Sequence, residues 1–240
     1  MNLVIDIGNT RTKVALFENN TIKKQESFTE GDWAIIKKKM PDLRQNKVII
    51  SSVDDIKSKK IQTYFPDALF FSHALNLPIS IQYNSAHVLG VDRIAAAIGA
   101  QFLFPYKNTL IIDLGSAITF DFLDANGQFL GGNISPGLHF RLKSLHQYTN
   151  KLPFIKPRSQ NTLIGKNTEE AINNGVVRGI IYEIEKYIDE YQENYNNLTV
   201  ILTGGDSYFF DKILKKTIFA EENLVLIGLN RILTYNDNNI

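Results

Sequence analysis

The sequence predicts an α/β protein built from a duplicated unit. Short apolar runs typical of buried strands alternate with stretches whose apolar residues recur at helical spacing. The run at residues 110–115 repeats the apolar–Asp–apolar–Gly pattern of residues 3–8, at an offset of 107 residues (113 minus 6). This period is far too long for a solenoid repeat and indicates a duplicated domain. We therefore expect an N-terminal domain over residues 1–107 and a C-terminal domain over residues 108–240.

The first half contains the elements expected of one α/β domain. Polar turns separate its apolar runs, and prolines at positions 41 and 105 each end a predicted helix. In chain order, we expect strands over residues 3–7, 14–17 and 21–23, a helix over 32–40, a strand over 47–51, and helices over 55–64 and 92–104.

The second half repeats the strand–turn–strand start and is then more helical. A helix is expected over residues 138–146 and a strand over residues 198–202. Between them, Thr168 is the predicted N-cap of a long helix with two acidic residues in its first turn. The apolar stripe of this helix comprises Ile172, Val176, Ile180, Ile184, Tyr187 and Tyr191. Two short elements and a frayed polar tail over residues 236–239 are expected to end the chain.

Composition excludes several classes of protein and site. The 26 Lys and Arg balance 25 Asp and Glu, which argues against a nucleic-acid partner. The absence of Cys excludes disulfides, thiolate catalysis and Cys-ligated metals, and 4 His argue against a multi-His metal site. No apolar run approaches the ~18 residues of a membrane helix, and the chain opens directly on a strand without a signal peptide. We therefore expect a cytoplasmic protein with no membrane partner.

The loop after the first predicted strand has the composition of a phosphate cradle. Asp6 ends the strand, Gly8 allows close backbone approach to anionic oxygens, and Lys13 supplies an ammonium group. Asp6 can also hold Mg²⁺, directly or through water. Taken alone, the loop is better explained as a tight turn with local hydrogen bonds. The second copy, Asp113-x-Gly115-Ser116-x-x-Thr119, changes this balance, because two such hairpins can clamp a polyphosphate between them.

Three further segments carry weaker signals. The pair Gly204-Gly205 follows a strand and can let a base or ribose lie against the backbone, although a plain strand-to-helix turn looks the same. Asp92 starts a predicted helix, where it fits either a helix cap or a general base with Arg93 beside it for negative charge. His146 lies at a helix end, where a lone His is more often an ordinary surface residue, and the other three histidines are expected to be structural.

In combination and order, these motifs resemble the type III pantothenate kinases of the actin, sugar-kinase and Hsp70 superfamily, over nearly the whole chain. The matching motifs are Asp6-x-Gly8-Asn9-Thr10-x-x-Lys13, Tyr83 with Gly90-x-Asp92-Arg93, Asp113-x-Gly115-Ser116-Ala117-x-Thr119, Gly132-x-Ile134-x-Pro136-Gly137, Gly165-x-Asn167-Thr168 and Thr203-Gly204-Gly205-Asp206. Ser116 stands where the family pattern has Thr, which keeps the hydroxyl and loses a methyl. The resemblance implies duplicated actin-like (ribonuclease-H-like) ATPase domains with a nucleotide cleft between them.

The resemblance also implies the reaction and its residues. ATP would phosphorylate the primary hydroxyl of pantothenate to 4'-phosphopantothenate, the first step of coenzyme A biosynthesis, with Asp92 as catalytic base. The implied nucleotide-binding residues are Asp6, Ile7, Gly8, Asn9, Thr10, Arg11, Thr12, Lys13, Ser116, Gly204 and Gly205. The implied pantothenate-binding residues are Tyr83, Gly90, Val91, Asp92, Arg93, His146 and Thr168. Mg²⁺ is assigned to Asp6, a monovalent cation (K⁺ or NH₄⁺) to Asp113, and the expected assembly is a homodimer.

Two other functions fit the same sequence less well. A related kinase could act on another small hydroxyl compound, but the superfamily does not in general require Tyr83 together with Gly90-x-Asp92-Arg93. A non-catalytic regulator related to transcriptional activators is expected to have lost Asp92 or the first phosphate loop, and both are intact here.

Overall fold

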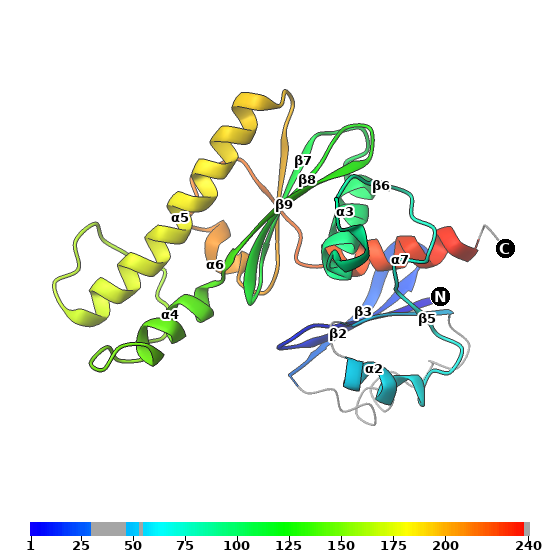
Figure 1. Cartoon of the computed structure of the whole chain (residues 1–240), viewed down its shortest axis with the longest axis horizontal. Coiled ribbons are helices and arrows are strands. Elements are labelled where there is room, and N and C mark those ends of the chain that lie inside the picture. The colour runs from blue at the N-terminus through cyan, green and yellow to red at the C-terminus, as the bar shows by residue number, and fades with distance from the viewer. Residues whose placement is uncertain (30–46, 53–54, 238–240) are drawn as a thin grey trace. The chain divides into compact units, whose positions relative to one another are not determined.

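The computed structural model describes residues 1–29, 47–52 and 55–237 and divides the chain into two compact units (Figure 1). Unit 1 contains Met1–Tyr106, Asn126–Leu130 and Asn223–Ile240, and unit 2 contains Lys107–Ala125 and Gly131–Glu222. The first boundary lies one residue from the predicted one. The C-terminal segment, however, groups with the first half of the chain, so unit 2 differs from the predicted domain 108–240. The helix expected over residues 32–40 lies outside the described residues.

Unit 1 contains a five-stranded mixed sheet in the order β3-β2-β1-β4-β5. Its strands are β1 (Asn2–Ile7), β2 (Thr12–Glu18), β3 (Thr21–Phe28), β4 (Lys47–Ser52) and β5 (Leu69–Phe70). β1 pairs antiparallel with β2 and parallel with β4. The apolar residues of these strands bury a core of Leu3, Ile5, Ile7, Val14, Ile50 and Ile61. The four strands predicted in the first half are therefore confirmed.

The helices of unit 1 are α2 (Asp55–Gln62), α3 (Val91–Leu103) and α7 (Leu224–Asp237), with a short 3₁₀ turn, η2 (Ala86–Val88). α7 packs against β1, β4 and α3, although more than a hundred residues separate it from them in sequence. The two helices cross at glycines: a Cβ on Gly228 would lie 1.8 Å from the carbonyl oxygen of Ala95, and one on Gly99 would lie 2.3 Å from that of Leu224. The prediction of only short elements at the end of the chain is therefore wrong.

A second sheet has six strands in the order β11-β10-β7-β8-β9-β6. These strands are β6 (Ser80–Ile81), β7 (Thr109–Leu114), β8 (Ala117–Leu123), β9 (Gln128–Pro136), β10 (Thr199–Thr203) and β11 (Phe219–Ala220). β7 pairs antiparallel with β8 and parallel with β10, which is in turn parallel to β11. β6 and the start of β9 belong to unit 1, and the remaining strands belong to unit 2.

The two sheets share one topology, which confirms the duplication predicted from the repeat. The order β3-β2-β1-β4-β5 in one sheet corresponds to β9-β8-β7-β10-β11 in the other, with β6 added at one edge. In both, an antiparallel hairpin starts the sheet and a parallel strand joins the far side of its first strand. The Asp-x-Gly motifs therefore end equivalent strands, β1 and β7.

Unit 2 is completed by α4 (Leu138–Gln147), α5 (Thr168–Asn194) and α6 (Ser207–Asp211). The predicted apolar stripe of α5 is confirmed, because Ile172, Val176, Ile180 and Ile184 are buried in the core and the two tyrosines pack against it. The N-cap of α5 is Asn167, whose side chain accepts a hydrogen bond from the amide of Glu170, so Thr168 is the first helical residue and not the cap. In the described part of the chain, no helix combines the length and apolarity needed to span a membrane.

Candidate active site

The first candidate loop connects β1 to β2, and Asp6 lies just before it. Asp6 sits opposite Lys13 on β2 and beside Ser51 on β4. The Gly8 amide donates to the carbonyl oxygen of Arg11 at 3.0 Å, which closes the loop and leaves its polar tip exposed. The side chains of Asp6 and Lys13 share one face of the sheet, because directly paired residues of antiparallel strands point the same way.

Asp6 has an altered acidity that shows which groups surround it. Its pKa is raised to about 6, first because it is buried and second because the negative charge of Asp92 lies nearby. Lys13 and the Ser51 hydroxyl act in the opposite direction. Ser51 Oγ is buried with no hydrogen-bond partner among the described residues, so it acts as a nearby dipole rather than through a formed bond. The fold of unit 1 therefore brings Asp6 near Asp92, although 86 residues (92 minus 6) separate them in the sequence.

Asp92 lies in the first turn of α3. The N-cap of this helix is Gly90, and Asp92 Oδ1 accepts a hydrogen bond from the Arg93 amide at 2.9 Å. A Cβ on Gly90 would lie 2.5 Å from this oxygen, so a side chain at position 90 would force the carboxylate to move. His73 Nε2 lies 2.8 Å from the carbonyl oxygen of Leu89 and must donate to it, which holds the residue before Gly90 in place. The expected structural role of His73 is therefore confirmed.

Arg93 is held between two aromatic rings. Only 8% of it is exposed, and its Cζ lies 5.8 Å from the ring centre of Tyr83 and 5.8 Å from that of Phe129. Distances under about 6 Å are typical of cation–π contacts. Tyr83 and Arg93, both expected at the acceptor side, are therefore brought together in unit 1. Phe129 was missed from the sequence because it lies in the second half, next to none of the motifs.

The second candidate loop connects β7 to β8. Asp113 sits opposite Thr119, whose hydroxyl donates to Asp121 Oδ2 at 3.0 Å. The Gly115 amide donates to the carbonyl oxygen of Ala117 at 3.1 Å, and Ser116 at the tip is exposed. The carbonyl oxygen of Ser116 accepts from the amide of Gly137 at 3.2 Å. The start of α4 therefore packs directly against this loop.

The glycine pair after β10 reaches the same place in unit 2. Gly204 has φ +92°, and a Cβ there would lie 2.4 Å from Asp113 Oδ1. The Asp206 amide donates to the carbonyl oxygen of Leu114 at 2.9 Å, which fastens this turn to the end of β7. Gly205, in contrast, is exposed with open space around it. The structure thus brings Asp113, the Ser116 loop and Gly204 together, as expected for parts of one site.

His146 and Thr168 lie on α4 and α5 of unit 2, away from these glycines in sequence. His146 is exposed, and its Nδ1 must donate to the carbonyl oxygen of Leu152 at 2.8 Å. Thr168 is exposed at the start of α5, beside a box in which Asn167 and Glu170 exchange hydrogen bonds at 2.9 and 3.0 Å.

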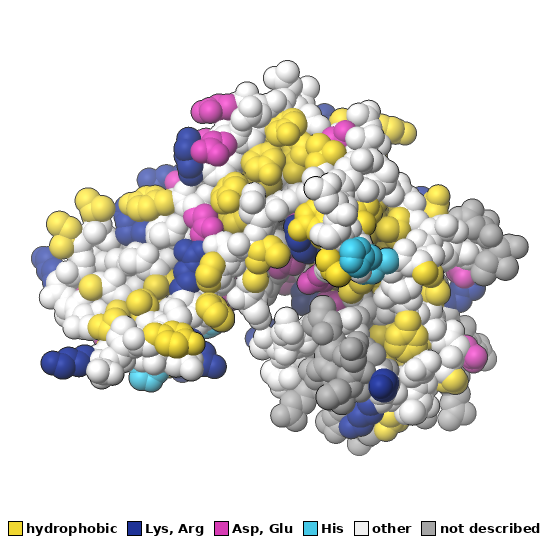
Figure 2. Space-filling view, in the orientation of Figure 1, with side chains coloured by type: hydrophobic (Ala, Val, Ile, Leu, Met, Phe, Trp, Pro, Cys, Tyr) yellow, Lys and Arg dark blue, Asp and Glu magenta, His cyan; other side chains and the backbone are white. Residues whose placement is uncertain are grey.

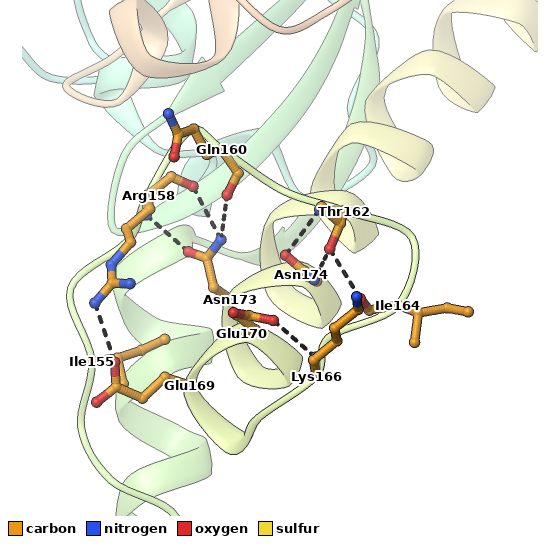
Figure 3. A pocket seen from close by; sticks show the side chains of 10 residues that line it. All are labelled: Ile155, Arg158, Gln160, Thr162, Ile164, Lys166, Glu169, Glu170, Asn173 and Asn174. Atoms are coloured by element: carbon orange, nitrogen blue, oxygen red, sulfur yellow. Dashed lines mark hydrogen bonds and ion pairs between the residues drawn. The ribbon is translucent and has the colours of Figure 1, made fainter.

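A strap of residues 155–166 folds over the start of α5 and lines an open pocket of about 410 Å³ (Figure 3). Two buried amides of α5 fasten it. Asn173 bonds the backbone of Arg158 and Gln160, and Asn174 bonds Thr162. The strap and the capping box together fix the backbone that leads into Thr168. Among the described residues, no group of three or more His, Asp or Glu could hold a metal ion.

Comparison with known proteins identifies what this chain resembles. Residues 2–190 match the family described as type III pantothenate kinase. Type III pantothenate kinases of Flavobacterium johnsoniae and Bacteroides fragilis are 39% and 42% identical to it, each with complete coverage of both chains. Two solved structures share its fold. One is a Campylobacter jejuni protein assigned to a Baf family of transcriptional activators (22% identity, 98% and 99% coverage, TM-score 0.67). The other is a Clostridium difficile activator of 2-hydroxyisocaproyl-CoA dehydratase with bound ADPNP (16%, 99% and 94%, TM-score 0.57).

Proposed function

Because the chain belongs to the type III pantothenate kinase family, we propose that it phosphorylates the primary hydroxyl of pantothenate with ATP, using Asp92 as the base. The product is 4'-phosphopantothenate, and the reaction is the first step of coenzyme A biosynthesis in the cytoplasm. The observation that carries the proposal is the electrostatic coupling of Asp6 with Asp92. It joins the loop suited to phosphates with the helix start suited to the acceptor, inside one unit of the fold.

We assign nucleotide binding to the β1–β2 loop, the β7–β8 loop and the glycine pair after β10. Backbone amides at the exposed tip of the first loop, the Lys13 ammonium and the Ser116 hydroxyl would supply donors for phosphate oxygens. Gly204 and Gly205 present bare backbone to the nucleoside. Phosphoryl transfer depends mainly on positioning the phosphates and neutralising their charge, which is the part assigned to Lys13.

Asp6 is a suitable ligand for Mg²⁺. Its half-buried carboxylate lies beside a buried hydroxyl, a set of hard oxygen atoms that this ion prefers. One carboxylate is enough, because Mg²⁺ usually keeps waters and nucleotide phosphates as its other ligands. When bound, the ion neutralises phosphate charge.

The acceptor side uses the start of α3. Asp92 Oδ1 is engaged by the Arg93 amide, which leaves Oδ2 to take the proton of the attacking hydroxyl. A loose transition state requires little deprotonation of the nucleophile until late, so a carboxylate suffices as base. Tyr83, Gly90, Val91 and Arg93 surround this position, and Arg93 offers in-plane N–H donors to an anionic group of the acceptor. His146 and Thr168 complete the assigned pantothenate contacts.

Asp113 is assigned to a monovalent cation, K⁺ or NH₄⁺, and the active assembly is a homodimer. The close approach of the Gly204 backbone to Asp113 Oδ1 places a carboxylate oxygen in a compact turn, and a carboxylate oxygen is a suitable ligand for such an ion. Large apolar side chains of α4, the strap region and α5 are exposed and suit burial against a second copy (Figure 2). They are Phe140, Tyr148, Phe154, Leu163, Ile164 and Tyr182.

The proposal is tested by ADP release from the purified protein over a panel of small hydroxyl compounds. Pantothenate-dependent release is expected, and release with a different acceptor alone would transfer the proposal to another kinase reaction. Asp92→Asn should lower the rate by at least ~100-fold, because base catalysis contributes ~10²–10⁴-fold, with ATP binding nearly unchanged. The exposed Asp67→Asn serves as control. An Asp92→Asn protein that lost stability but kept its specific activity would limit Asp92 to a role in helix structure.

A further inference from the structure

Phe129 is a fully buried ring that the second half of the sequence delivers to unit 1. It lies in the segment Asn126–Leu130, which groups with unit 1 although the chain on both sides of it belongs to unit 2. The turn before it is tight, since Gly127 has φ +77° and a Cβ there would lie 2.5 Å from Gln101 Nε2. The hairpin of β8 and β9 therefore carries one large ring into the unit that holds Asp92.

The ring of Phe129 contacts both expected acceptor-side groups. Its edge-to-face contact with Tyr83 has a centroid distance of 6.4 Å and an interplanar angle of 65°. The Arg93 guanidinium lies 5.8 Å from both ring centres, so the two aromatic residues share one cation. Contacts to two ring faces fix the position of the guanidinium group, whose planar set of N–H donors matches the geometry of a carboxylate.

The backbone of Phe129 also forms hydrogen bonds to the segment that leads into Tyr83. β6 pairs in parallel with β9, with Ile81 aligned with Phe129. The Gln82 amide donates to the carbonyl oxygen of Phe129 at 2.9 Å, and the Ser80 amide donates to that of Gly127 at 3.0 Å. The residue immediately before Tyr83 is thus tied to Phe129 through the main chain, while the Tyr83 ring is tied to it through the side chain.

We propose that Phe129 is a positioning residue for the acceptor site, which fixes the Tyr83 ring and the Arg93 guanidinium in the arrangement that receives an anionic hydroxy compound. It acts through these two residues and touches no reacting atom. The inference rests on the proposed function, because it assigns the role of one more residue in the same site. The prediction is a selective effect on acceptor binding and not on nucleotide binding or the transfer step.

The direct test replaces the ring by an aliphatic side chain, Phe129→Leu, in the full-length enzyme. The KM for pantothenate should rise about five- to thirtyfold, which is the size of a desolvated cation–π contact. Both kcat and the KM for ATP should stay within about twofold, since the rings lie on the acceptor side. If the Phe129→Leu protein does not fold, Phe129→Met is used for the same measurements, because the flexible Met side chain can fill the space left by the ring. Unchanged KM for pantothenate, or equal rises in both KM values, would overturn the proposal.

Two further variants separate positioning from simple destabilisation. Phe122→Leu removes another buried ring of the same hairpin, one that packs on Tyr191 and Tyr195, so it should lower stability and leave the KM for pantothenate unchanged. In a Tyr83→Leu background, Phe129→Leu should add less than it does alone, because the two residues act as a unit. An equal rise in Phe122→Leu, or strict additivity with Tyr83→Leu, would contradict the proposal. A wild-type enzyme without pantothenate-dependent ADP release would instead overturn the proposed function.

Discussion

The two Asp-x-Gly hairpins occupy equivalent places in the two sheets and yet have different surroundings. In the first, Asp6 faces Lys13 and lies near Asp92. In the second, Asp113 faces Thr119, whose hydroxyl is engaged by the buried Asp121. The second connection is also one residue shorter, with three residues between the last paired positions instead of four. Duplication kept the backbone and the acid, and divergence placed a cation opposite the acid in the first hairpin and a hydroxyl opposite it in the second.

This difference suggests a division of labour between the hairpins. The first combines opposite charges, which suits the neutralisation and orientation of transferring phosphates. The second is surrounded by close backbone, with Gly137 and Gly204 packed against its loop. It suits shape-dependent contact with a nucleotide more than charge neutralisation. The predictions below test this division from the strongest effect to the weakest.

Removing the side-chain groups opposite Asp6 and Asp113 should lower kcat by unequal amounts. Lys13→Ala removes the ammonium from the first hairpin and should lower kcat by ~10²-fold or more, as loss of a preorganised charge contact does. Thr119→Ala, at the matching place in the second hairpin, should change kcat by less than about threefold, because the lost hydroxyl carries no charge that could neutralise the phosphate oxygens. Steady-state kinetics with saturating pantothenate measure both. Comparable losses of kcat in the two variants would mean that both hairpins contribute to neutralising the phosphate charge.

The backbone of the second hairpin should tolerate no side chain at Gly204. Gly204→Ala combines a left-handed backbone with a Cβ 2.4 Å from Asp113 Oδ1, and should raise the KM for ATP about 30-fold, equivalent to ~2 kcal/mol of strain and overpacking. Gly175→Ala in α5 is the control, since its Cβ would meet nothing within 4 Å and it is not among the residues assigned to the nucleotide. Nucleotide titration of both proteins measures the difference. Equal ATP affinities would remove Gly204 from the nucleotide site.

How much of the fold and of the candidate site could be predicted from sequence depends on whether the residues that form a feature are neighbours in the chain. Both hairpins and the glycine turn were predicted because their residues are adjacent in the chain and chemically distinctive. α7 was missed because Gly228 lowers local helix propensity, and its reason for being glycine is contact with Ala95 in a remote helix. Phe129 was missed for the same reason, since its partners lie on α3 and next to β6.

Replacing potassium should affect the second hairpin alone. If Asp113 holds the monovalent cation, exchange of K⁺ for Na⁺ should lower the rate about tenfold, equivalent to ~1.4 kcal/mol. Asp113→Asn should be slower in K⁺ and nearly insensitive to the exchange. ADP release in matched chloride salts at constant ionic strength gives both rates. Equal wild-type rates in the two salts would refute the cation assignment and leave the nucleotide assignment of Gly204 intact.

Ionisation of Asp6 in the first hairpin should lower the free energy of unfolding as the pH rises. The pKa of Asp6 is about 6 in the folded protein and 3.8 for the ordinary group, so the folded state holds this proton more tightly than the unfolded chain does. The contribution of Asp6 to stability therefore falls as the pH rises from about 4 to about 6, and it stays low above that range. The full shift corresponds to at most about 3 kcal/mol.

Asp6→Asn removes this cost, and the pKa of about 6 already includes the opposing attraction to Lys13, so the gain in unfolding free energy above pH 6 should be at most about 3 kcal/mol. The gain should be mostly lost near pH 4, because the Asp6 carboxyl is then protonated in the folded state and close to its ordinary pKa of 3.8 in the unfolded chain. Urea unfolding of wild type, Asp6→Asn and the exposed control Asp67→Asn at pH 4, 5, 6 and 8 measures it. A difference between wild type and Asp6→Asn that stays constant over this range would show that burial beside Asp92 does not set the acidity of Asp6. The difference in charge between the surroundings of the two hairpins would then have to come from Lys13 alone.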